Sequence, residues 1–98
     1  MELAKAFGEV LREHRIRLEL TQEQLAFEAD IRRTYVSMLE LGQHQPTLTM
    51  LFTLGIALKC TPSELVAEVE RKLESNKRQQ KKTPAAAKKR VRAVSNRN

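Results

Sequence analysis

The 98-residue sequence predicts an all-α fold of five helices, followed by a basic, mobile C-terminal tail. Apolar residues recur at helical spacing over most of the first three quarters of the chain. Glycine and proline are scarce, with three of each, and β-branched runs are short. A threonine, a residue type that often caps the start of a helix, precedes several of the apolar segments. Residues 1–75 are therefore expected to form one helical domain, and residues 76–98 a tail with too little apolar content to bury.

The first two predicted helices are defined by apolar spacing and a clear start signal. The first helix covers residues 2 to 18, with an apolar stripe made by Leu3, Phe7, Leu11, His14 or Arg15, and Leu18. Thr21 and Gln24 have the spacing of a capping box, which starts the second helix. Its apolar face consists of Leu25, Ala26 and Ala29.

The third predicted helix follows after a tight break. Asp30 stands where the chain must turn, because aspartate tolerates a left-handed backbone better than most residues. Ile31 can fill the gap between the two helices. Val36 and Leu39 are expected to face inward, with Tyr35 as a possible third member. Two short helices around such a break are the layout of a DNA-binding helix-turn-helix, in which the second helix enters the major groove.

Gly42 suits a helix C-terminal turn, and Thr47 can cap the fourth helix. The expected core residues of that helix are Leu48, Leu51, Leu54, Ala57 and Leu58. Gly55 interrupts the helix, which predicts close packing against a neighbouring helix.

The fifth helix has the cleanest start in the chain. Thr61, Pro62 and Glu64 are an N-cap, a first helical proline and a capping-box glutamate. The helix should fade between residues 75 and 82.

The segment from residue 8 to about 66 resembles the Cro/CI-type (XRE) helix-turn-helix family of phage-repressor-like regulators. The matching positions are Gln22, Leu25, Ala26, Tyr35, Val36, Glu40, Gly42, Pro46, Leu51 and Leu54. The short string RTYVS at residues 33–37 is most similar to controller proteins of restriction–modification systems. The resemblance implies a lambda-repressor-like domain and a sequence-specific transcriptional regulator that binds double-stranded DNA. Such a regulator would act as a homodimer on a pseudo-palindromic operator.

Four residues of the third helix are left facing outward and are candidates for base contact. The fork of Arg33 can pair with guanine O6 and N7 in the major groove, although a solvated surface arginine is the alternative. For Thr34 and Ser37 the sequence does not decide whether the side chain contacts a base. Met38 can contact a thymine methyl group or fill the edge of the core.

The resemblance adds further roles. Gln22 matches a phosphate-binding glutamine of the family, and Arg32 replaces the usual capping Ser or Thr with a charge suited to phosphate. Tyr35 either reaches phosphate through its hydroxyl or packs in the core. Arg15 and Glu40 match a family pair that forms an inter-helix salt bridge. His14 replaces a family leucine, which implies a half-buried packing role.

An apolar patch is expected beside the fourth and fifth helices. Phe52 and Ile56 lie four residues apart, off the face already used for the core. Together with Val66, Val69 and Leu73 they predict a dimer interface. The alternative is that the start of the tail folds over these residues.

The charge of the chain is unevenly spread. Residues 1–76 hold nine Lys/Arg and twelve acids, a net charge of −3, whereas residues 77–98 hold nine Lys/Arg and no acid, a net charge of +9. Because the tail has no aromatic residue, phosphate contact is its expected mode of DNA binding. A solubilising or protein-interaction tail is the alternative.

The composition also predicts absences. Cys60 is the only cysteine, so there is no internal disulfide or cysteine-based zinc site, and a buried thiol is expected. We expect no metal, cofactor or small-molecule site and no catalysis, because a nucleophile–base pair and a phosphate loop are missing. Without a signal peptide or membrane span, a cytoplasmic, nucleoid-associated location is the default. The rival hypothesis is a protein-interaction module, such as an antitoxin-like partner, that uses the same fold.

Overall fold

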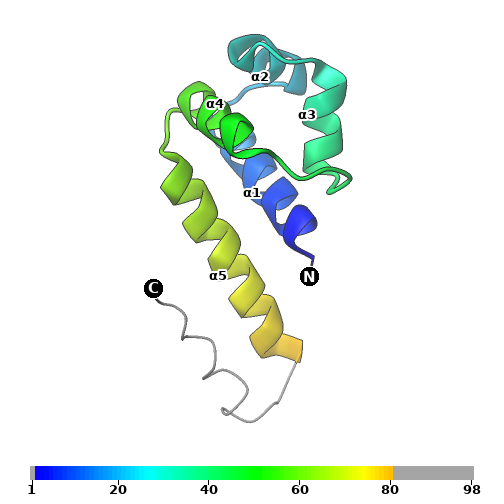
Figure 1. The fold of residues 1–98 in the computed structure, drawn as a ribbon, viewed down its shortest axis with the longest axis vertical. Helices are drawn as coiled ribbons and strands as arrows, with labels where there is room; N and C mark the ends of the chain where they lie inside the picture. Colours follow the sequence, from blue (N-terminus) through cyan, green and yellow to red (C-terminus); the bar gives the residue numbers. More distant parts are fainter. Residues whose placement is uncertain (1, 81–98) are drawn as a thin grey trace.

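The computed structural model describes the backbone of residues 2–80 and the side chains of residues 2–76. Its five helices are α1 (Leu3–Arg17), α2 (Gln22–Ala29), α3 (Arg33–Glu40), α4 (Leu48–Leu58) and α5 (Pro62–Gln80) (Figure 1). The described residues contain no strand, which confirms the all-α prediction. The predicted mobility of the tail concerns residues that lie outside the described part, except for the end of α5.

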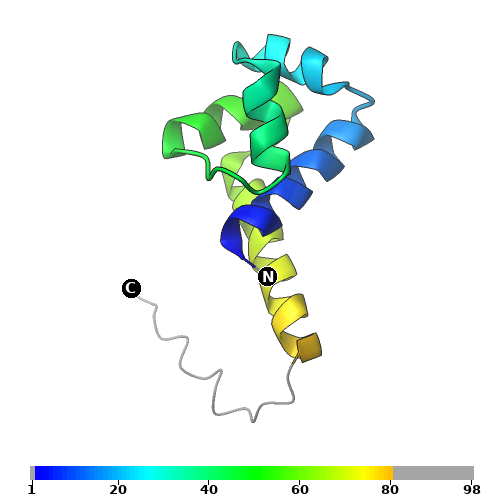
Figure 2. The same ribbon diagram turned by 90° about the vertical axis from the view of Figure 1, so that its right-hand side faces the viewer.

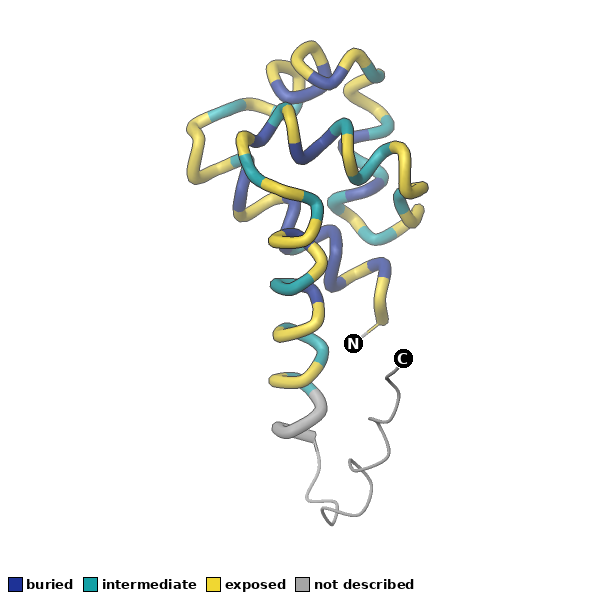
Figure 3. The backbone as a smooth tube through the Cα atoms, turned by 60° about the vertical axis from the view of Figure 1, so that its left-hand side comes forward, coloured by how far each residue is buried: buried dark blue, intermediate teal, exposed yellow. Residues whose placement is uncertain are grey.

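The core is built around α1, which packs against both α3 and α5, while α2 packs against α3 and α4. Figure 3 shows the buried segments gathered where the helices meet, whereas residues 70–76 of α5 are exposed or half-buried. The largest fully buried side chains are Leu11, Leu25, Leu39, Leu54, Leu65, Val10 and Val36. The core is therefore mainly aliphatic, and Phe7 is the only phenylalanine or tyrosine that is buried among the described residues.

The predicted start and stop signals are confirmed. The Thr21 side chain accepts a hydrogen bond from the Gln24 backbone N–H at 3.0 Å, and the Gln24 side chain accepts one from the Thr21 N–H at 2.8 Å. Thr61 and Glu64 form a second such box, and these hydrogen bonds hold the pKa of Glu64 below its ordinary value. Asp30 ends α2 in the left-handed conformation with φ 57°.

Several predicted core positions are wrong, because each lies at an end of its helix. Leu48 is 71% exposed as the first residue of α4, and only later turns of that helix reach the core. Leu3 and Leu18 flank the buried part of α1 and are also exposed. Cys60 is half-buried rather than fully buried, and partial desolvation raises the pKa of its thiol.

Two glycines mark close backbone contacts. A Cβ at Gly55 would lie 2.9 Å from the Cys60 carbonyl oxygen and 3.3 Å from Cδ of Pro62, the first residue of α5, which agrees with the predicted close packing. A Cβ at Gly8 would lie 2.5 Å from the carbonyl oxygens of both Leu39 and Glu40. The α1 backbone therefore touches the C-terminal end of α3 directly, a contact that the sequence pattern did not indicate.

Within the described residues, no single helix is long and apolar enough to cross a membrane. Only α4 and residues 62–76, taken together across a bend of 103°, have the length and composition to do so.

Candidate nucleic-acid interface

One side of α3 supplies the core and the other supplies a polar surface. Val36 and Leu39 are fully buried against α1 and α2. On the opposite side Arg33 and Thr34 are exposed, and Ser37 and Met38 are half-buried. These four outward residues, Arg33, Thr34, Ser37 and Met38, are called the reading face below. The amphipathic pattern of this helix places them on the side away from the core.

Arg32 occupies the N-cap of α3 with an extended backbone and makes no side-chain cap. Its guanidinium is thus not used to cap the start of the helix, and the residue is exposed beside the reading face. Figure 2 shows α2 and α3 together at the end of the domain opposite the last turns of α5. Arginines gathered at the N-terminal end of a helix are suited to the phosphates and base edges of a major groove.

Gln22, the first residue of α2, bridges to both ends of α3. Its side-chain Nε2 donates to Glu40 Oε1 at 3.0 Å, and its Oε1 accepts from an Arg33 guanidinium nitrogen at 3.4 Å. The structure thereby brings together two of the predicted phosphate- and base-contacting residues. The sequence pattern indicated separate roles for Gln22 and Arg33 and did not indicate that they touch.

Arg15 and Glu40 form a two-pronged ion pair between α1 and α3. Arg15 Nε lies 2.6 Å from Glu40 Oε2, and a second guanidinium nitrogen lies 3.1 Å from Oε1. The remaining guanidinium nitrogen donates to the Leu20 carbonyl oxygen at 2.8 Å. Side-chain exposure is only 12% for Arg15 and 5% for Glu40, so the pair is largely removed from water. It ties the C-terminal end of α3 to α1.

Tyr35 is neither fully buried in the core nor fully exposed. Its ring is half-buried against the core, and its centre lies 6.2 Å from the ring centre of His44 in the following loop. His44 itself is exposed. The partial exposure of Tyr35 leaves both core packing and phosphate contact through its hydroxyl compatible with its position.

The predicted dimer residues divide into two groups. Phe52, Ile56 and Val66 are 55%, 81% and 48% exposed and are called the apolar patch below. Leu73 is half-buried against the core. The expectation that Val69 is exposed is wrong, because Val69 follows the fully buried Leu65 by one helical turn and points into the same core, where it is 6% exposed.

Other contacts reinforce the domain away from the reading face. His14 is 8% exposed, more deeply buried than expected, and its Nε2 lies 3.0 Å from Glu68 Oε1 on α5. Lys72 reaches Glu13 at 2.8 Å and Glu9 at 3.6 Å, and the hydrogen bond to Glu13 raises the pKa of Lys72. These contacts join α1 to α5. No group of three metal-binding side chains occurs in the described part of the chain.

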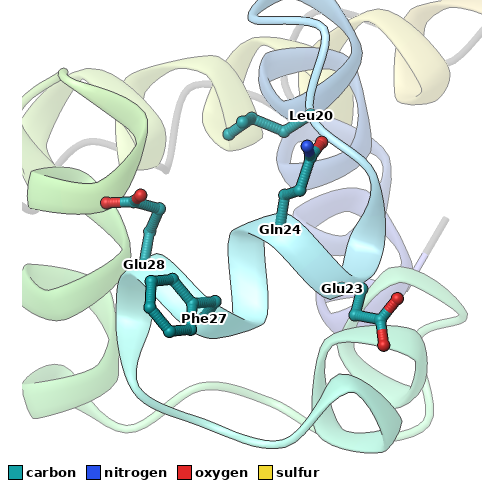
Figure 4. Close-up of a pocket in the computed structure, with 5 residues that line it drawn as sticks. All are labelled: Leu20, Glu23, Gln24, Phe27 and Glu28. Atoms are coloured by element: carbon teal, nitrogen blue, oxygen red, sulfur yellow. The ribbon is translucent and has the colours of Figure 1, made fainter.

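One exposed aromatic residue was not predicted from the sequence. Phe27 is 84% exposed on α2, and together with Leu20, Glu23, Gln24 and Glu28 it lines a shallow depression (Figure 4). The signal was available, because Phe27 lies off the apolar face formed by Leu25, Ala26 and Ala29.

The fold and the outward polar face of α3 define a helix-turn-helix regulator that binds DNA. The chain belongs to the helix-turn-helix family, whose model matches residues 11–65. This bears out the Cro/CI-type resemblance. The control protein C.BamHI of Bacillus amyloliquefaciens is 36% identical over 61 residues, which cover 61% of this chain and 75% of that protein.

Two solved structures are similar in fold. The restriction–modification controller protein C.AhdI from Aeromonas hydrophila is 40% identical, with a TM-score of 0.62 over 63% of this chain and 94% of that one. The clp gene regulator ClgR from Corynebacterium glutamicum is 24% identical, with a TM-score of 0.76 over 81% of this chain and 84% of that one. At that identity the second likeness shows the fold alone. These similar proteins are regulators rather than enzymes.

Proposed function

We propose that the chain binds double-stranded DNA sequence-specifically, as a homodimer on a pseudo-palindromic operator, and so regulates transcription. The observation that carries this proposal is the reading face: four polar or unbranched side chains stand outward on a helix whose other side is fully buried. A helix held in this way can enter the major groove without loss of core contacts.

Each site residue then has a role. Arg33 pairs with a guanine edge, while Thr34, Ser37 and Met38 contact neighbouring bases. Arg32, Gln22 and Tyr35 border the reading face and contact phosphate oxygens, which fix the position of the domain on the duplex. Gln22 is the first residue of α2, and the N-terminal end of a helix favours an anion.

Selection of binding sites from random duplex DNA tests the proposal as a whole. We expect enrichment of a two-fold symmetric motif whose half-site centres lie roughly 10 bp apart, or a multiple of that spacing. An unenriched pool would instead favour the protein-interaction module, for which the fold serves a protein partner.

Arg33→Ala should weaken binding to the selected site by about 1–3 kcal/mol and relax the preference at one base position in each half-site. The matched control is Arg71→Ala, which removes the same charge from an exposed position on α5. Titration of both variants on selected and scrambled duplexes checks the prediction. An equal loss by Arg33→Ala on both duplexes would show that Arg33 contacts only phosphate.

The apolar patch is the proposed dimer interface, since Ile56 alone is 81% exposed between Phe52 and Val66. Ile56→Glu should give monomers in light scattering and weaker operator binding, because a charge would be buried without a partner. Phe27→Glu is the control: it changes an equally exposed apolar residue on α2 and should leave the dimer intact. A wild-type protein that stays monomeric at micromolar concentration, alone and on operator DNA, would contradict the homodimer.

A narrower role is controller of a restriction–modification system. The 40% identical C.AhdI is named a restriction–modification controller protein and the 36% identical C.BamHI a control protein, and the string RTYVS includes three of the four reading-face residues. The test is to place the selected motif in the source genome. We expect sites upstream of restriction or methyltransferase genes, and a response from a reporter gene placed there. Sites elsewhere would indicate a general transcriptional regulator instead. Either role requires cytoplasmic access to the chromosome.

A further inference from the structure

We propose that Glu40 helps to set the base preference of this protein without touching DNA, by orienting Gln22, which in turn positions Arg33. The inference rests on the proposed role of Arg33 in base contact and deepens it. Three side-chain contacts form one continuous chain from the core to the reading face: Arg15 to Glu40, Glu40 to Gln22, and Gln22 to Arg33.

Hydrogen-bond chemistry fixes the direction of every link in this chain. The Glu40 carboxylate, paired with the Arg15 guanidinium, can only accept hydrogen bonds. The Gln22 amide must therefore turn its NH2 group toward Glu40, where the distance is 3.0 Å. Its carbonyl oxygen is left pointing away from Glu40. Arg33 can only donate, and it meets that oxygen at 3.4 Å.

A reversed Gln22 amide would place its carbonyl oxygen against the Glu40 carboxylate, which cannot donate, and would turn its NH2 group toward Arg33, which cannot accept. Glu40 thus decides which end of the amide faces the reading face. The glutamate is suited to this task because it is held rigidly: its side chain is 5% exposed and bound at both oxygens by Arg15. Arg33, by contrast, is an exposed side chain that would otherwise sample many rotamers.

Holding one guanidinium nitrogen of Arg33 leaves the rest of the fork free for a base. The arginine is thereby presented in one orientation before DNA arrives, which lowers the entropy lost on binding. Gln22 is then a positioning residue as well as a candidate phosphate contact. The two roles differ in their consequences, because a phosphate contact acts equally on all sequences, whereas positioning acts at the base that Arg33 reads.

The experiment is a double-mutant cycle of Gln22→Ala and Arg33→Ala, measured on the selected site and on duplexes changed at the position read by Arg33. Gln22→Ala leaves the Arg15–Glu40 pair intact, so the domain should fold. We expect it to reduce discrimination at that position by about three- to tenfold. In the Arg33→Ala background the same change should reduce discrimination no further. Gln43→Ala, an exposed glutamine in the loop after α3, is the matched control and should leave discrimination unchanged.

Glu40 is tested by the paired variant Arg15→Met/Glu40→Met, which removes both charges together and so avoids leaving one buried alone. We expect relaxed discrimination at the Arg33 position in a protein that still melts cooperatively. If Arg33→Ala relaxes that position but Gln22→Ala weakens all duplexes equally, the positioning chain is overturned and Gln22 contacts phosphate only. If Arg33→Ala itself leaves discrimination unchanged, the proposed base contact fails instead.

Discussion

Glu40→Ala is expected to lower the free energy of unfolding by about 3–5 kcal/mol, a large part of what a domain of this size has. The reason is the charge that remains. Arg15 is only 12% exposed, and without Glu40 it keeps the Leu20 carbonyl oxygen as its acceptor but has no counter-ion at that position. Urea denaturation followed by circular dichroism measures the change.

The paired Arg15→Met/Glu40→Met variant separates this effect from packing. When both charges are replaced by apolar side chains of similar length, the desolvation cost disappears together with the attraction. We therefore expect the paired variant to be much more stable than Glu40→Ala. A loss below about 1 kcal/mol for Glu40→Ala, typical of a solvent-exposed ion pair, would contradict the burial of this one.

Ending the chain after Gln80 is expected to weaken binding to specific and random DNA alike. The slope of the logarithm of the binding constant against the logarithm of salt concentration should also become shallower by several units. The removed residues 81–98 carry seven Lys/Arg and no acid, whereas residues 1–76 have a net charge of −3. Each phosphate neutralised on duplex DNA contributes about 0.9 to that slope. Because α5 runs to Gln80, this end point keeps the whole helix, whereas a chain ended at residue 75, the domain boundary expected from the sequence, would cut it.

The matched control is a full-length chain in which those seven Lys/Arg are changed to Gln. It keeps the length of the tail but not its charge, so we expect it to behave like the truncated protein. Titrations at several salt concentrations on operator and scrambled duplexes provide the slopes. Identical slopes for wild-type and truncated protein would mean that the tail does not contact DNA and would leave protein contact or solubility as its role.

The helix boundaries could be predicted because their causes are local. Thr21, Thr47 and Thr61 each cap a helix through a backbone N–H three residues away, and such spacing is visible in the sequence. Asp30 likewise ends α2 through its own backbone conformation. The outward residues of α3 followed from the helical period once Val36 and Leu39 were assigned to the core.

The remaining features depend on contacts between distant residues. Gln22 and Glu40 are 18 positions apart, and nothing in their spacing indicates that they share a hydrogen bond. The same holds for His14 and Glu68, which are 54 positions apart. Val69 was assigned to the exposed patch because an apolar residue on the flank of a helix fits either side. The rotation of α5 against α1 decides between them, and packing of whole helices determines that rotation.

The contact at Gly8 has a consequence for which positions of this protein can be exchanged. Because Gly8 has no Cβ, α1 meets the Leu39 and Glu40 carbonyl oxygens directly and fixes the C-terminal end of α3. Arg33 and Thr34, at the other end of that helix, are exposed. If Arg33 and Thr34 contact bases as proposed, exchanging those two side chains would change the operator preference without disturbing the core, whereas any side chain at position 8 would push α3 away from α1 and so move both residues together.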